Sequence, residues 1–150
     1  MNDPRPIEAS VEIDAPPDAV WALVSDVRRM PEFSPELRKV WSLGRATGTG
    51  ARFVGVNRRG VVAWPTLSTV VRWEPARAVA WKTRESGATW VYELEPAGER
   101  TRLVGRRVLP RFTLGTTLLG PVSGGAAGHD TELAAGLCTT MERMKARLEA

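Results

Sequence analysis

The chain is poor in the residues that most often carry metal or covalent chemistry. Among its 150 residues there is one cysteine, Cys138, and one histidine, His129. A single cysteine excludes an internal disulfide, and this pair of residues is too small a set for a zinc site of the usual cysteine and histidine spacing. The sequence also lacks a phosphate-binding loop with its Lys-Ser/Thr ending and a serine in a nucleophile-elbow pattern. We therefore predict no metal and no nucleotide cofactor.

Long apolar runs are missing as well. No stretch approaches the roughly 20 apolar residues of a membrane span, and the opening residues, MNDPRPIEAS, lack the basic-then-apolar order of a signal peptide. We expect a cytoplasmic protein without stable membrane insertion. A chain of 150 residues suits one domain over residues 1–150 that buries a core without disulfides. Whether it is a monomer or a homodimer stays open.

The charge is basic but not concentrated in the sequence. The formal net charge is +4, lysine occurs only at Lys39, Lys82 and Lys145, and the longest basic groupings are pairs. A nucleic-acid-binding protein gathers its cations on one element, often with aromatic residues between them. We therefore predict that no nucleic acid is a partner.

The N-terminal part predicts one strand followed by two short helices. Residues 7–15, IEASVEIDA, alternate between apolar and polar side chains, as in a half-buried strand. The next segment, PPDAVWALVSD, predicts a helix, and Pro17 suits its first turn because the N–H that proline lacks is unpaired there. Asp26 is placed to end this helix and to cap a second one over VRRMPEF.

The middle of the chain predicts six further strands. Runs rich in Val, Trp, Thr and Phe are separated by turn signals such as NRRG and PAGER, and the short spacers favour antiparallel hairpins. Pro65 should place the start of its strand at an edge or a bulge. The predicted strands cover residues 36–44, 50–58, 61–73, 78–85, 88–95 and 101–109.

The C-terminal part predicts a long helix preceded by an unusual segment. Residues 113–128, TLGTTLLGPVSGGAAG, are apolar yet rich in glycine. They predict either a mobile lid hinged at its glycines or the first turns of the helix, bent at Gly124 and Gly125. From residue 129 onward one stripe recurs with a helical period. Its members are His129, Leu133, Gly136, Leu137, Thr140, Met144 and Leu148.

This order of elements predicts an α+β fold with a curved sheet. One long helix cannot cover seven antiparallel strands if the sheet stays flat. A strongly curved sheet that wraps the helix solves the burial problem. Such an arrangement leaves a gap between the concave face and the helix wherever the facing side chains are small.

Several segments resemble the polyketide cyclase/dehydrase family of the START-like (SRPBCC) superfamily. They are ASVEIDAPPDAVWALVSDVRRMPEFSPELRKV, GARFVGVNRRG, WVYELEPAGERTRLVGRRVLP and TTMERMKARLE, in the family's order and over nearly the whole chain. The resemblance implies a helix-grip fold around a deep hydrophobic cavity. It also implies a hydrophobic small-molecule ligand, since members bind lipids, isoprenoids or polyketides and a minority catalyse cyclisation or dehydration.

Strand parity selects the residues that should face this cavity. Trp90 and Tyr92 share one face of their strand, and Trp81 and Thr83 share one face of the strand before it. Binding pockets combine such apolar and aromatic walls with a few polar groups. The polar candidates are Asn57, Thr66, Ser68, Arg72, Thr83 and Arg107. The predicted ligand-binding set is Phe33, Phe53, Asn57, Trp81, Trp90, Tyr92, Leu118, His129 and Leu133.

His129 allows three interpretations. It can line the cavity, hydrogen-bond to a ligand, or act as a general base with Glu132, which lies three residues further along the helix. From the expected cavity and the family resemblance, we expect a protein that binds a hydrophobic small molecule. The alternatives are an aromatase/cyclase or dehydratase of a polyketide-like substrate, with His129 and Arg107 as its catalytic residues, and an accessory protein that binds another protein through its surface.

Overall fold

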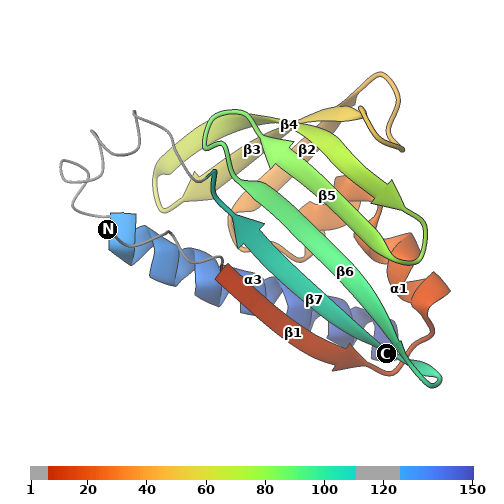
Figure 1. Cartoon of the computed structure of the whole chain (residues 1–150). Helices are drawn as coiled ribbons and strands as arrows, with labels where there is room; N and C mark the ends of the chain where they lie inside the picture. The colour runs from red at the N-terminus through yellow and green to blue at the C-terminus, as the bar shows by residue number, and fades with distance from the viewer. Residues whose placement is uncertain (1–6, 111–125) are drawn as a thin grey trace.

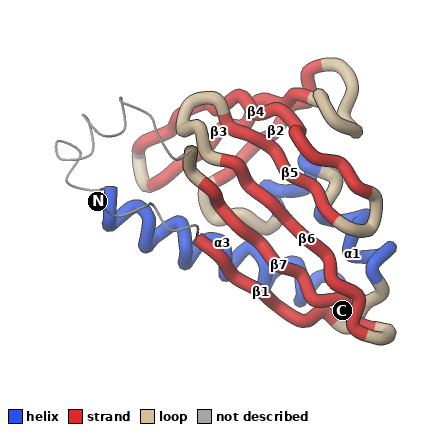
Figure 2. Tube along the Cα trace, viewed as in Figure 1, coloured by secondary structure: helices blue, strands red, loops and turns tan. Residues whose placement is uncertain are grey.

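A computed structural model describes residues 7–110 and 126–150, with the side chains of the last helix described from Leu133 onward. It contains β1 (Ile7–Ile13), α1 (Pro17–Val24), η1 (Val27–Glu32), β2 (Leu37–Leu43), β3 (Arg52–Arg59), β4 (Val62–Glu74), β5 (Ala78–Thr83), β6 (Thr89–Ala97), β7 (Arg100–Val108) and α3 (Ala126–Glu149). The strands form one antiparallel sheet in the order β1-β7-β6-β5-β4-β3-β2, which curves around α3 (Figures 1 and 2). The predicted α+β helix-grip architecture is confirmed.

The two short helices connect strands at opposite edges of the sheet, because β1 and β2 are its two edge strands. Pro17 stands at the start of α1, as predicted. The second helix, η1, is a 3₁₀-helix, and Asp26 caps it by accepting a hydrogen bond from the Arg28 backbone N–H at 3.2 Å. The same carboxylate also pairs with the exposed Arg28 guanidinium.

The Asp26→Ala substitution is expected to lower the free energy of unfolding by about 1 kcal/mol. The loss comes from the cap, since exposed ion pairs contribute little. Urea denaturation of Asp26→Ala and Arg28→Ala, which removes only the ion pair, separates the two contributions. An equal loss in both variants would contradict the cap as the source.

The ladder between β4 and its neighbours explains how Pro65 fits within a strand. Pro65 is in register with Val56 of β3, whereas the pairing of β4 with β5 begins only at Ser68. On its β5 side, β4 therefore has no paired strand at Pro65, and the N–H that proline lacks is not needed there. This agrees with the predicted edge position. A register shift between Val70 and Arg72 then marks a bulge further along β4.

The core lies between the concave face of the sheet and α3. Leu137, Met141 and Met144 on the helix are all buried. The packing is tight at Gly105 of β7, where a β-carbon would lie 2.9 Å from Met141 Sδ. Near its C-terminal end, α3 is hydrogen-bonded to the end of β1, where Lys145 Nζ donates to the Glu12 carbonyl at 2.7 Å.

The helix begins slightly earlier than predicted. Residues 126–128, which the sequence placed in the glycine-rich segment before the helix, belong to α3. For these residues the helical alternative is correct and the lid is not. Residues 113–125 of that segment lie outside the described part of the chain.

Candidate functional site

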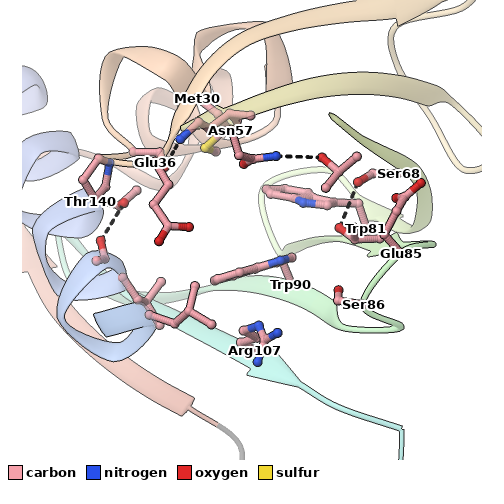
Figure 3. Close-up of a pocket in the computed structure, with 18 of the residues that line it drawn as sticks. Met30, Glu36, Asn57, Ser68, Trp81, Glu85, Ser86, Trp90, Arg107 and Thr140 are labelled. Atoms are coloured by element: carbon pink, nitrogen blue, oxygen red, sulfur yellow. Dashed lines mark hydrogen bonds between the residues drawn. The ribbon is translucent and has the colours of Figure 1, made fainter. Parts of the chain in front are cut away.

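A cavity of about 300 Å³ lies between the concave face of the sheet and α3. The segment that follows η1 closes one side, and residues of α3 from Leu133 to Thr140 close another (Figure 3). The volume is at the lower end of the range for small-molecule sites. The cavity reaches the surface near the β5–β6 turn, where the lining residues Glu85 and Ser86 are exposed.

Aromatic rings form the sheet side of the cavity. The rings of Phe53 and Trp81 meet edge to face with centroids 5.9 Å apart, and Trp81 lies 5.7 Å from Tyr92 in a tilted arrangement. Trp90 continues the wall, with the guanidinium carbon of Arg107 5.7 Å from the centroid of its ring. Leu133 and Leu137 face this wall from α3. A planar apolar ligand could join the cluster in the same edge-to-face or offset geometry.

Most neutral polar groups of the wall have partners within the protein. Asn57 Nδ2 donates to Thr66 Oγ1 at 3.1 Å, and the Ser68 and Thr83 hydroxyls are hydrogen-bonded at 2.9 Å. Thr140 Oγ1 donates to the carbonyl of Gly136 within the helix. Polar groups that are already paired can border an apolar ligand without the cost of an unpaired donor.

Three charged residues also line the cavity, and Glu85 is the one at its entrance. Glu36 precedes β2, and its carboxylate reaches into the space between α3 and the Trp90 indole (Figure 3). Arg107 comes from β7, which lies near the other edge of the sheet from β2, and it lies beside Trp90. A carboxylate and a guanidinium that border one apolar space can orient an oxygenated ligand. In a reaction, the carboxylate could transfer a proton and the guanidinium could stabilise a negative charge.

Burial raises the pKa of the Tyr92 phenol above its ordinary value. Above about pH 10 the unfolded chain loses this proton while the folded protein keeps it. The free energy of unfolding should therefore fall above pH 10, by up to about 1.4 kcal/mol per pH unit. Because Tyr92 is the only tyrosine, urea denaturation of Tyr92→Phe at pH values from neutral to alkaline isolates the effect. The same alkaline decline in that variant would contradict this assignment.

The structure brings most of the predicted site residues to one cavity. Trp90 is less than half exposed, as the strand parity requires. Of the predicted ligand-binding residues, those that line the cavity are Phe53, Asn57, Trp81, Trp90, Tyr92 and Leu133. Of the other polar candidates, Thr66, Ser68, Thr83 and Arg107 line it.

Two other candidates, Phe33 and Arg72, are placed outside the cavity wall. Phe33 is buried in the core, and its carbonyl accepts from Arg143 at 3.1 Å, beyond the part of α3 that borders the cavity. Arg72 pairs with Glu74 and with Glu93, because the bulge after Val70 reverses the parity of β4. Leu118 and the side chain of His129 lie outside the described residues.

Several lining residues were not predicted as site residues. Met30, Ser34, Glu36 and Leu37 come from the irregular segment around the end of η1, which has no periodicity to indicate a face. Trp64 could have been found, since it has the strand parity of Thr66 and is in register with Asn57.

In the described part of the chain, no group of three or more His, Cys, Asp and Glu side chains is placed to hold a metal ion. No helix there is long and apolar enough to cross a membrane.

Comparison with known proteins agrees with this architecture. A sequence model of the family described as "Polyketide cyclase / dehydrase and lipid transport" matches residues 5–149. The solution structure of Cgl2372 from Corynebacterium glutamicum, a Polyketide_cyc-like protein, is similar at 26% identity, with a TM-score of 0.63 over 97% of this chain and 91% of that chain. A START superfamily protein from Mycobacterium smegmatis shares 16% identity, with a TM-score of 0.69 over 96% of this chain and 97% of that chain.

A third similar structure is the di-domain ARO/CYC StfQ from the steffimycin biosynthetic pathway. It shares 17% identity, with a TM-score of 0.73 over 96% of this chain and 51% of that chain. This chain therefore corresponds to about half of StfQ, and at this identity the likeness concerns the fold alone. No curated protein matches the chain in sequence.

Proposed function

The chain belongs to the polyketide cyclase/dehydrase and lipid transport family, and on that premise we propose that it binds a hydrophobic, ring-containing small molecule in the cavity under α3. The observation that carries the proposal is the aromatic wall of Phe53, Trp81, Tyr92 and Trp90 on one side of a cavity of about 300 Å³. Each ring offers a face or an edge to an aromatic ligand. A straight acyl chain would gain only the contact area.

Calorimetric titration with two matched alcohols tests this proposal. 2-Naphthol and 1-decanol have the same number of carbons and one hydroxyl each, but only the first has rings. We expect 2-naphthol to bind about fivefold more tightly, because each aromatic pair adds roughly 0.5–1.5 kcal/mol beyond its buried area. Tighter binding of 1-decanol would favour a lipid chain as the ligand, and no binding of either alcohol would contradict the proposal.

The second candidate function is an aromatase/cyclase or dehydratase reaction on a polyketide-like substrate. The observation that favours it is that Glu36 and Arg107 line the same cavity. Glu36 would take a proton from the carbon next to a ketone, and Arg107 would donate a hydrogen bond to the oxygen that becomes an enolate. Attack of that carbon on a second carbonyl of the substrate would close a ring, and the Glu36 proton would pass to the new alkoxide.

Substitution of the carboxylate separates the enzyme from the binding protein. With a synthetic poly-β-ketone thioester as substrate, Glu36→Gln should lower the rate of cyclisation by about 100-fold or more. Its affinity for 2-naphthol should stay within about tenfold of the original. His129→Phe, assayed in parallel, tests the histidine in the same way. Cyclisation at the uncatalysed rate with the unaltered protein would exclude the enzymatic function for this substrate.

A further inference from the structure

The acidic residues are unevenly distributed over the fold. Residues 37–71, which comprise β2, β3, most of β4 and the turns between them, contain no aspartate or glutamate. The same stretch contains six basic residues, Arg38, Lys39, Arg45, Arg52, Arg58 and Arg59. Within the described structure no ion pair involves Arg38, Lys39 or Arg58. The side chains of this stretch therefore carry charge of one sign, and the carboxylate of Glu85 in the β5–β6 turn borders it by accepting a hydrogen bond from the Leu67 N–H.

The rest of the sheet is different, because its arginines are matched with carboxylates across strands. Arg102 pairs with Glu95 at 3.0 Å, and Arg106 pairs with both Glu8 and Glu93. An arginine-rich sequence alone does not explain the basic stretch, since arginines on the other strands do have acidic partners. The difference indicates that Arg38, Lys39 and Arg58 face a partner that supplies the negative charge.

The tip of the β3–β4 hairpin adds exposed apolar side chains to these basic ones. Gly60 and Val61 form a two-residue turn, and the φ of Gly60 is +62°, as the first position of a tight hairpin turn allows. Val61 is 95% exposed and Val62 is 61% exposed. Arg58 lies beside them, and its Nε donates to the Gly60 carbonyl at 2.9 Å. Two adjacent apolar side chains thus project from the end of the hairpin, with a cation next to them.

The hairpin tip lies at the end of the sheet where the cavity reaches the surface. Asn57 and Trp64, which line the cavity, form the third residue pair from this tip. The antiparallel order places the β5–β6 turn, with the exposed lining residues Glu85 and Ser86, at the same end (Figure 1). A surface that engages the tip is therefore next to the entrance of the cavity.

We propose that the hairpin tip, defined by Arg58, Val61 and Val62 with Arg38 and Lys39 beside it, docks the entrance of the cavity on an anionic lipid bilayer. The interface of a bilayer accepts shallow apolar side chains, and anionic headgroups attract adjacent basic side chains. A soluble acidic protein would use the cations but would leave the exposed valines without a role. The statement that a ligand passes between the bilayer and the cavity rests on the proposed function. Docking of the protein on the bilayer does not.

Co-sedimentation with lipid vesicles tests docking. The protein should bind vesicles of phosphatidylcholine mixed with an equal amount of phosphatidylglycerol, and it should bind pure phosphatidylcholine far less. Exchange of both valines, Val61→Ser with Val62→Ser, should lower the partition coefficient about tenfold, because two apolar side chains no longer enter the interface. Arg58→Ser should lower it about fivefold, as each basic residue near an anionic surface contributes about 1 kcal/mol.

Matched controls lie on the same strands at the other end of the sheet. Leu43 is 45% exposed and is in register with the exposed Arg52. Leu43→Ser and Arg52→Ser should leave vesicle binding nearly unchanged. Equal losses at the two ends of the sheet would overturn the proposal, because the attraction would then be general.

Two further results would also overturn docking on a bilayer. One is the absence of binding to the anionic vesicles. The other is that the protein binds soluble polyglutamate but not vesicles, and that the Arg58→Ser variant loses this binding. That result would assign the surface to an acidic protein. Calorimetry with 2-naphthol on the same samples shows separately whether the cavity binds a ligand, so failure of docking and failure of the proposed function remain distinguishable.

Discussion

The Gly105→Val substitution is expected to lower the free energy of unfolding by roughly 2–3 kcal/mol. Gly105 of β7 packs directly against side chains of α3. A β-carbon there would lie 2.9 Å from Met141 Sδ, 3.1 Å from Leu137 Cδ1 and 3.2 Å from Tyr92 Cε1. Met141 is almost fully buried, so its side chain has little room to move away. The helix must then shift from the sheet or the neighbouring side chains must leave their preferred rotamers.

A second glycine, within α3, should give the opposite result. At Gly136 of α3 a β-carbon would meet only Pro35 Cγ, at an ordinary contact distance of 3.5 Å. Gly136→Ala should therefore raise the free energy of unfolding by about 0.5–1 kcal/mol, since alanine favours a helix interior. Urea denaturation measures both variants. A destabilised Gly136→Ala variant would contradict the open space beside that glycine, and an unaffected Gly105→Val variant would contradict the tight contact between β7 and α3.

The Trp81→Ala substitution is expected to have the largest effect on stability and also to weaken binding. Trp81 is 8% exposed and contacts the rings of Phe53 and Tyr92 in the wall of the cavity. Its removal should cost about 3–5 kcal/mol of unfolding free energy. It should also weaken 2-naphthol at least tenfold, because the ligand loses its central ring contact.

An exposed tryptophan on the same sheet is the control for this substitution. Trp41 of β2 is 52% exposed, so Trp41→Ala should change stability by less than about 1 kcal/mol and leave 2-naphthol binding unaltered. Trp81→Phe, which keeps a ring in the wall, should recover most of the affinity. Loss of binding in Trp41→Ala but not in Trp81→Ala would place the ligand on the outer face of the sheet.

The sheet and most of its inward face could be predicted because strand periodicity determines which side chains face the core. The parity of Trp81, Thr83, Trp90 and Tyr92 leads directly to the cavity wall. The same rule fails at Arg72, where one bulged residue turns the side chain to the other face. A bulge depends on pairing with the neighbouring strand, and the sequence of one strand does not record it.

Irregular segments were the other source of difference. Phe33 was expected in the cavity and Glu36 was not, yet Phe33 is in the core and Glu36 lines the cavity. Both follow η1, where neither a period of 2.0 nor one of 3.6 applies. The direction of such side chains is set by how η1 packs beside β2, which is a tertiary property.

Calorimetric titration of 2-naphthol into a pair of tryptophan variants tests the central claim, that a ligand binds inside the cavity, most directly. Leu133 lines the cavity, whereas Ala135, two residues along α3, is exposed. Leu133→Trp should obstruct the space between α3 and the aromatic wall and weaken binding at least tenfold, while the unaltered protein and Ala135→Trp should each bind one molecule with the same affinity. Unchanged binding by Leu133→Trp would contradict the account, because the ligand would then occupy another part of the molecule.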